Sequence, residues 1–133
     1  GAREFLDELR TRYQLIILSD TFYEFADPLM QQLGRPTLFC HRLLIDEQGF
    51  VAGYRLRQPD QKRHAVIALQ GLNYRVLAAG DSYNDTAMLT AADAGFLMHA
   101  PPNIVAEFPQ FPLNDSYPQL LASIDAAAAR LPG

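Results

Sequence analysis

Hydrophobic residues fall into short unbroken runs at several points along the chain. Residues 15–18 are all apolar and lead into Ser-Asp-Thr, and residues 76–79 are all apolar and lead into Gly-Asp. Unbroken apolar runs of this length indicate strands that are buried on both faces, as in a parallel sheet. Residues 37–40 and 94–98 predict two further strands.

Elsewhere apolar residues recur at helical spacing among polar neighbours, as Phe5, Leu6 and Leu9 do. Asp27 and Pro28 are expected to open a helix, with Pro28 at its first position, because proline is favoured there. The helices predicted in this way are residues 2–12, 28–32, 60–72, 85–92, 104–108 and 117–130.

Polarity alternates in residues 41–46 and 50–57, on either side of Glu-Gln-Gly, which predicts a β-hairpin. The remaining strands alternate with helices along residues 1–133, and this order indicates one open α/β domain. We therefore expect a mainly parallel, Rossmann-like sheet with flanking helices and one hairpin. Such sheets place their binding sites at the carboxyl ends of the strands.

Composition narrows the class of protein. The 133 residues are 49% hydrophobic and 20% charged, as in an ordinary globular domain. A formal charge of −4 without any run of Lys or Arg argues against nucleic acid or an anionic membrane as a partner. The one cysteine, Cys40, cannot form an internal disulfide, which favours a reducing cytoplasm.

Three polar clusters lie where the predicted sheet should have its site. They are Ser19, Asp20 and Thr21 after one strand, Lys62 at a helix start, and residues 80–85 after another strand. A hydroxyl and backbone N–H groups at a strand end can hold phosphate oxygens, and a lysine adds positive charge for the same group.

The third cluster, Gly-Asp-Ser-Tyr-Asn-Asp, also offers metal ligands. Asp81 and Asp85 carry the hard oxygen atoms that Mg²⁺ prefers, and Asn84 can donate to phosphate without adding charge. Each cluster alone has a structural explanation: a helix cap, a solvated lysine, or the cap and first-turn acid of one helix. Two acids and an amide crowded after a buried strand nevertheless favour a functional site.

Four segments resemble the haloacid dehalogenase superfamily, and within it the phosphoserine phosphatase group, especially its bifunctional phosphoserine phosphatase/homoserine phosphotransferase members. These segments are LIILSDTFYEF, QKRHAVIAL, AAGDSYNDTAML and HAPPNIVAEFPQFP. The first three are similar to the family's second, third and fourth motifs. The resemblance implies a magnesium-dependent phosphatase or phosphotransferase that acts on a small phosphorylated metabolite such as phosphoserine.

The resemblance also implies roles for individual residues. Lys62 would neutralise the phosphate and the nucleophile, and Asp81 would bind Mg²⁺ directly. Asp85 would act on the metal directly or through water. The implied substrate contacts are Ser19, Asp20, Thr21, Lys62 and Asn84.

One departure from the family pattern affects the expected activity. The first motif, Asp-x-Asp after a central strand, supplies the nucleophile, and it does not occur in these 133 residues; the family's helical cap is also missing. We expect the chain to be the C-terminal part of the core and to have no turnover alone. The missing strand would lie between the strands ending at Ser19 and Gly80, so the parent protein, or another chain in an oligomer, should supply it.

Two other classes of function remain open at this stage. The same loops could form a non-catalytic phosphate- or metal-binding domain, or a receiver-like signalling domain, although the lysine lies too early for the latter. His41 and His64 are expected to be surface or hairpin residues, and His99 should lie at the edge of the site.

Overall fold

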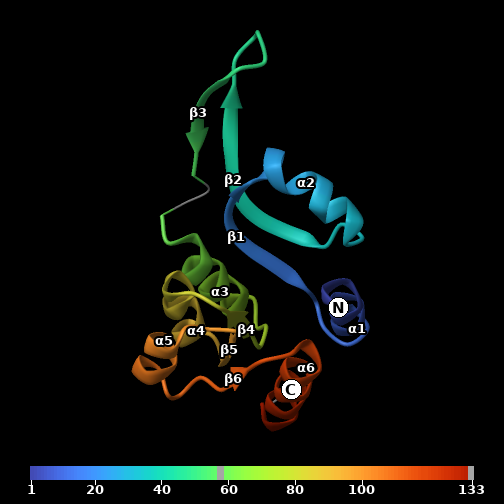
Figure 1. Cartoon of the computed structure of the whole chain (residues 1–133), viewed down its shortest axis with the longest axis vertical. Coiled ribbons are helices and arrows are strands. Elements are labelled where there is room, and N and C mark those ends of the chain that lie inside the picture. The colour runs from blue at the N-terminus through green and yellow to red at the C-terminus, as the bar shows by residue number, and fades with distance from the viewer. Residues whose placement is uncertain (57–58, 132–133) are drawn as a thin grey trace. The chain divides into compact units, whose positions relative to one another are not determined.

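The structure is a computed structural model that describes residues 1–56 and 59–131 (Figure 1). Its helices are α1 (Ala2–Arg10), α2 (Tyr23–Gln32), α3 (Gln61–Gly71), α4 (Thr86–Ala91), α5 (Pro102–Glu107) and α6 (Tyr117–Arg130), with a 3₁₀ turn η1 (Tyr83–Asp85). Its strands are β1 (Ile16–Phe22), β2 (Thr37–Ile45), β3 (Val51–Arg55), β4 (Leu77–Gly80), β5 (Ala94–Met98) and β6 (Leu113–Asn114). The chain divides into two compact units, Ala2–Gln61 (the N-terminal unit) and Lys62–Gly133 together with Gly1 (the C-terminal unit).

The N-terminal unit contains a three-stranded sheet in the order β1-β2-β3. β1 pairs with β2 in parallel, and β2 pairs with β3 antiparallel as the predicted hairpin. β2 runs through both the predicted strand at residues 37–40 and the first arm of the hairpin. Arg57, the predicted end of the second arm, lies outside the described residues.

Two predictions for the N-terminal unit are wrong. Ser19–Thr21 lie within β1 and not after it, although the register with β2 is interrupted between Leu18 and Phe22. α2 begins at Tyr23, so Pro28 lies inside the helix. Burial of the helix face that includes Ala26 stabilises α2 enough to offset the backbone hydrogen bond that Pro28 cannot donate.

The C-terminal unit contains a second sheet, parallel throughout, in the order β4-β5-β6. The short strand β6 was not predicted, because two residues carry no periodic signal. Asn114 fixes it: its amide nitrogen donates to the carbonyl oxygens of Leu97 and Pro112, and its amide oxygen accepts from the Ser123 hydroxyl. The core residues of this unit include Val66, Leu89, Phe96, Leu97, Ile104, Leu120 and Ile124.

The strands expected to flank a missing strand each have one neighbour. β1 hydrogen-bonds to β2 and β4 to β5, and β1 and β4 belong to different sheets. The α/β class and the alternation of strands with helices are confirmed, whereas the described strands form two sheets and not one. No helix within residues 1–56 and 59–131 is both long and apolar enough to span a membrane.

Replacing Gly95 with alanine should destabilise the C-terminal unit. A Cβ there would lie 2.9 Å from the Leu89 carbonyl oxygen and 3.0 Å from Cδ1 of Phe111, and overpacking of this kind costs about 1–3 kcal/mol. Gly71→Ala is the matched control, since a Cβ there meets nothing within 4 Å. Urea unfolding should show a lower midpoint for the Gly95 variant alone; equal midpoints would contradict this packing.

Candidate active site

The loop after β4 is organised around the buried carboxylate of Asp85. One carboxylate oxygen accepts the backbone N–H of Asp81 at 3.0 Å, the N–H of Ser82 at 3.2 Å and the Ser82 hydroxyl at 3.3 Å. Ser82 and Asp85 also form a capping box around η1. A Cβ on Gly80 would lie 2.5 Å from Cβ of Asp85, so only glycine permits this approach.

The other oxygen of Asp85 pairs with Lys62. Nζ of Lys62 lies 2.7 Å from Oδ1, and the two side chains are 15% and 8% exposed. Burial by itself raises the pKa of Asp85. The hydrogen bond and charge of Lys62, together with the N–H groups of Asp81 and Ser82, lower this pKa by more than burial raises it. The net effect is a pKa below the ordinary value, so Asp85 stays ionised and both of its oxygens are engaged.

Asp81 and Asn84 lie on the exposed side of the same loop. No residue that the structure describes donates a hydrogen bond to the Asp81 carboxylate, and the described part of the chain holds no group of three His, Cys, Asp or Glu side chains that could form a metal cage. Mg²⁺ is usually held by one or two carboxylates, with water and phosphate completing its shell. The donor set therefore fits Mg²⁺ through Asp81, without a complete protein cage.

Tyr83 anchors the exposed side of the loop to α5. Its hydroxyl donates to Oε1 of Glu107 at 3.2 Å, and its ring meets that of Phe108 edge-on, with 6.0 Å between centroids. These contacts limit the movement of Asn84, the next residue along the chain.

Ser19 is held within the N-terminal unit. Its hydroxyl accepts the N–H of Thr21 at 3.2 Å, and its carbonyl oxygen accepts from the side-chain amide of Gln61. Gln61 is 3% exposed, and its amide oxygen is buried without a partner among the described residues. The sequence pattern placed Gln61 inside a helix at residues 60–72 and gave it no other role, and no spacing rule marks a glutamine that bonds 42 residues away.

Asp20, next to Ser19, also has a partner that sequence reasoning missed. Nε2 of His41 lies 3.4 Å from Oδ1 of Asp20. His41 was expected to be a surface or hairpin residue: it lies in β2, the first strand of the hairpin, but it is buried, at 7% exposed, and in register with Phe22. His99 is exposed and has a positive φ of 52°.

The predicted site residues thus fall into two groups, one in each unit. Ser19, Asp20 and Thr21 belong to the N-terminal unit, and Lys62, Asp81, Asn84 and Asp85 to the C-terminal unit. A lysine–carboxylate pair beside a free carboxylate at the end of a parallel strand is suited to binding a divalent cation and an anion. The fold and this loop define an α/β protein with a candidate phosphate-binding site.

Comparison with known proteins agrees with this class. Residues 1–93 match the family described as haloacid dehalogenase-like hydrolase, and the chain belongs to that family. Phosphoserine phosphatase ThrH of Pseudomonas aeruginosa is 59% identical over 98% of this chain, which covers 63% of that protein. A phosphoserine phosphatase of Pseudomonas syringae pv. tomato is 58% identical, and the chain covers 55% of it. The chain therefore spans less than two thirds of the length of these relatives.

The fold is also found in a solved structure, a phospho-aspartyl intermediate analogue of phosphoserine phosphatase. It superimposes with a TM-score of 0.74 over 92% of this chain and 62% of that one, at 20% sequence identity. This likeness concerns the fold alone. The family resemblance drawn from the sequence motifs is confirmed.

Asp85→Asn should destabilise the protein in a pH-dependent way. The variant leaves Lys62 buried without its partner, which costs about 3 kcal/mol. Because the folded-state pKa of Asp85 is below its unfolded value, the stabilisation is complete above about pH 5 and is lost as the pH falls through the folded-state pKa.

Urea unfolding of wild type and variant between pH 8 and pH 3 measures the effect. The difference in unfolding free energy should be constant above about pH 5 and shrink below about pH 4. Asp81→Asn, an exposed change on the same loop, is the control and should alter stability by no more than about 0.5 kcal/mol. A difference that grows as the pH falls would contradict the pair.

Proposed function

We propose that the complete protein to which these residues belong is a magnesium-dependent phosphomonoester phosphatase, with phosphoserine as substrate. The observation that carries this proposal is the Lys62–Asp85 pair together with the exposed Asp81, whose backbone N–H donates to Asp85. The names of the two Pseudomonas relatives support the choice of phosphoserine. Transfer of the phosphoryl group to the hydroxyl of homoserine would use the same chemistry, with an alcohol in place of water.

Each polar residue has a distinct part in this proposal. Ser19 and Asn84 bind phosphoryl oxygens, and Asp20 and Thr21 are further substrate contacts from the same segment as Ser19; the backbone N–H of Thr21 donates to the Ser19 hydroxyl. Lys62 offsets the negative charge of phosphate, and its ammonium group stays in place because Asp85 accepts one of its hydrogen bonds.

The metal would be held by Asp81. Mg²⁺ bound there would supply Lewis-acid stabilisation of charge on the phosphoryl oxygens. Asp85 accepts hydrogen bonds from the chain at both of its oxygens, which favours action on the metal through water over direct coordination. Its part is to orient Lys62 and the N–H groups of the loop, and any action on the metal passes through water.

The nucleophile is proposed to lie outside these 133 residues, since no Asp-x-Asp sequence occurs among them. The 133 residues alone would then bind anions or metal without turnover. A cytoplasmic location agrees with the single cysteine, Cys40, which is buried as a free thiol. If the complete protein also lacks activity, the alternative of a non-catalytic phosphate- or metal-binding domain takes precedence.

Phosphate release from phosphoserine with Mg²⁺ tests this proposal, measured on the 133-residue chain and on the longer natural protein. We expect turnover in the longer protein only. Asp81→Asn in that protein should lower kcat about 10²–10³-fold, because metal stabilisation of the transition state is worth several kcal/mol.

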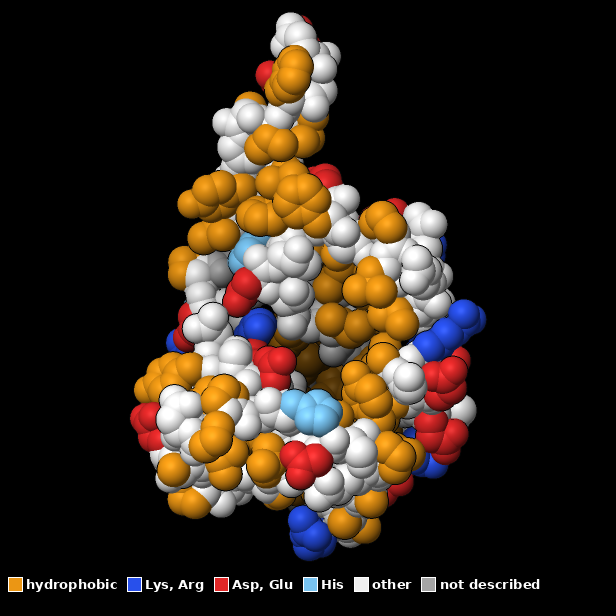
Figure 2. All heavy atoms as spheres, viewed as in Figure 1, with side chains coloured by type: hydrophobic (Ala, Val, Ile, Leu, Met, Phe, Trp, Pro, Cys, Tyr) orange, Lys and Arg blue, Asp and Glu red, His pale blue; other side chains and the backbone are white. Residues whose placement is uncertain are grey.

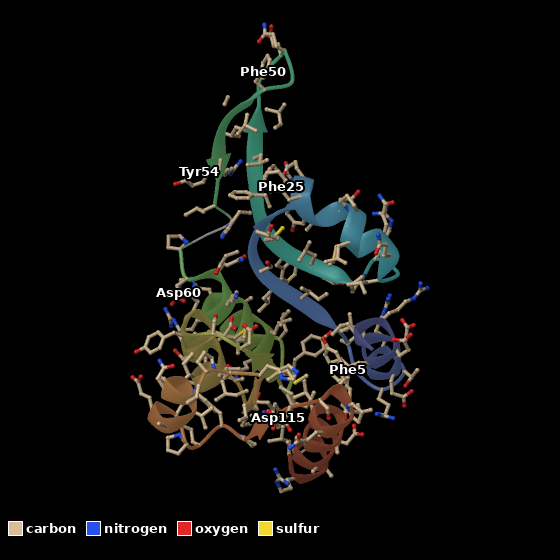
Figure 3. The ribbon with its side chains drawn as sticks, in the orientation of Figure 1. Phe5, Phe25, Phe50, Tyr54, Asp60 and Asp115 are labelled. Carbon is tan, nitrogen blue, oxygen red and sulfur yellow. The ribbon has the colours of Figure 1, made fainter. Side chains whose placement is uncertain are left out.

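Asp115→Asn is the matched control, since Asp115 is exposed at the start of the loop before α6 (Figure 3). It removes the same charge and should leave kcat unchanged. Full activity in the Asp81 variant would contradict the proposal that Asp81 binds the metal. Turnover by the 133 residues alone would contradict the proposal that the nucleophile lies outside them.

A further inference from the structure

The N-terminal unit buries the polar side chain of Gln61 while large apolar side chains stay exposed. Ile45, Val51 and Tyr54 of the hairpin are 50%, 61% and 63% exposed, and Figure 2 shows hydrophobic side chains gathered along that hairpin. Gln61, by contrast, is 3% exposed. Glutamine is mostly a surface residue, and burying its amide is costly unless the amide is hydrogen-bonded. The burial of Gln61 therefore needs a specific reason.

One end of the Gln61 amide has a partner and the other does not. Its nitrogen donates to the carbonyl oxygen of Ser19. Its oxygen is buried and accepts no hydrogen bond from the residues that the structure describes. The two ends cannot exchange places, because an amide oxygen beside the Ser19 carbonyl would set two acceptors against each other. An unpaired buried acceptor is unfavourable, so it offsets much of what the bond to Ser19 contributes to stability.

Ser19 is fixed by contacts other than the strand ladder. The register of β1 with β2 is interrupted between Leu18 and Phe22. The Ser19 carbonyl is held by Gln61, and the Ser19 hydroxyl accepts the N–H of Thr21 at 3.2 Å. A hydroxyl that accepts one hydrogen bond still has its proton to donate, and no residue in 1–56 or 59–131 takes that proton. These contacts therefore fix an O–H group that is available to a ligand.

We propose that Gln61 is a positioning residue: by holding the Ser19 carbonyl, it places the Ser19 hydroxyl to donate to an oxygen of the phosphoryl group. This inference rests on the proposed function, in which Ser19 binds that group. Hydrogen bonds to charged groups are the stronger ones, and their strength falls steeply as the angle departs from linear. A small displacement of Ser19 should therefore weaken anion binding more than it weakens the fold.

Binding of inorganic phosphate with Mg²⁺ to the longer natural protein, measured by titration calorimetry, tests this inference without any turnover. Gln61→Met keeps the length of the side chain and removes both ends of the amide. The phosphate dissociation constant should rise about tenfold. The urea midpoint should stay close to that of the wild type, because the variant loses the bond to Ser19 and the unpaired oxygen together.

Gln61→Asn gives a second variant that keeps the amide but shortens its reach by one methylene group. It should weaken phosphate binding as Gln61→Met does, and it tests the inference even if the methionine variant fails to fold.

Gln70→Met is the matched control. Gln70 also belongs to α3, and its amide nitrogen also donates to a backbone carbonyl, that of Ala91, at 2.9 Å. Its loss should lower the urea midpoint and leave the phosphate dissociation constant unchanged. Equal weakening of phosphate binding by the Gln70 and Gln61 variants would mean that Gln61 has only a structural part.

The double variant Gln61→Met with Ser19→Ala shows whether Gln61 acts through the hydroxyl. If it does, the two effects do not add, and the double variant should bind phosphate as weakly as Ser19→Ala alone. Unchanged binding in the Gln61 variants, additive effects in the double variant, or a wild type that binds no phosphate would overturn the inference. A wild type that binds phosphate but releases none from phosphoserine would overturn the proposed function alone.

Discussion

The buried ion pair between Lys62 and Asp85 is the interaction on which the candidate site depends. Their separation of 2.7 Å brings a cation from the start of α3 to the loop after β4. Removing two charges from water is costly unless their remaining hydrogen bonds are satisfied, and here the loop supplies N–H groups of Asp81 and Ser82 to the carboxylate. Satisfying Asp85 therefore shapes the loop, and the shaped loop leaves Asp81 facing solvent.

A similar requirement explains Ser19 in the N-terminal unit. The strand ladder between β1 and β2 is interrupted there, and a buried backbone carbonyl without a partner is unfavourable. Gln61 supplies the missing donor from the first position of α3. In both units, a segment that carries candidate site residues meets a polar side chain from α3: Ser19 accepts from Gln61, and Asp85 pairs with its neighbour Lys62.

Much of this arrangement could be predicted from the sequence, because burial leaves a pattern. The apolar runs before Ser19 and Gly80 predicted β1 and β4, and alternating polarity predicted the hairpin. Patterns report which face of an element is buried, but they do not name its partners. The hydrogen bond of Gln61 to Ser19, the approach of His41 to Asp20 and the place of Pro28 inside α2 all depend on tertiary packing. The motifs of the candidate site were recognised by likeness to a family. The structure then showed that Asp85 is buried and hydrogen-bonded, whereas Asp81 is exposed.

The close approach of Asp85 to Gly80 restricts how this protein can change over evolutionary time. Any side chain at position 80 collides with Asp85, because even a Cβ there would lie 2.5 Å from Cβ of Asp85. Lys62 cannot be lost without leaving the aspartate uncompensated. A substitution at position 62 or 80 would therefore be tolerated only together with one at position 85.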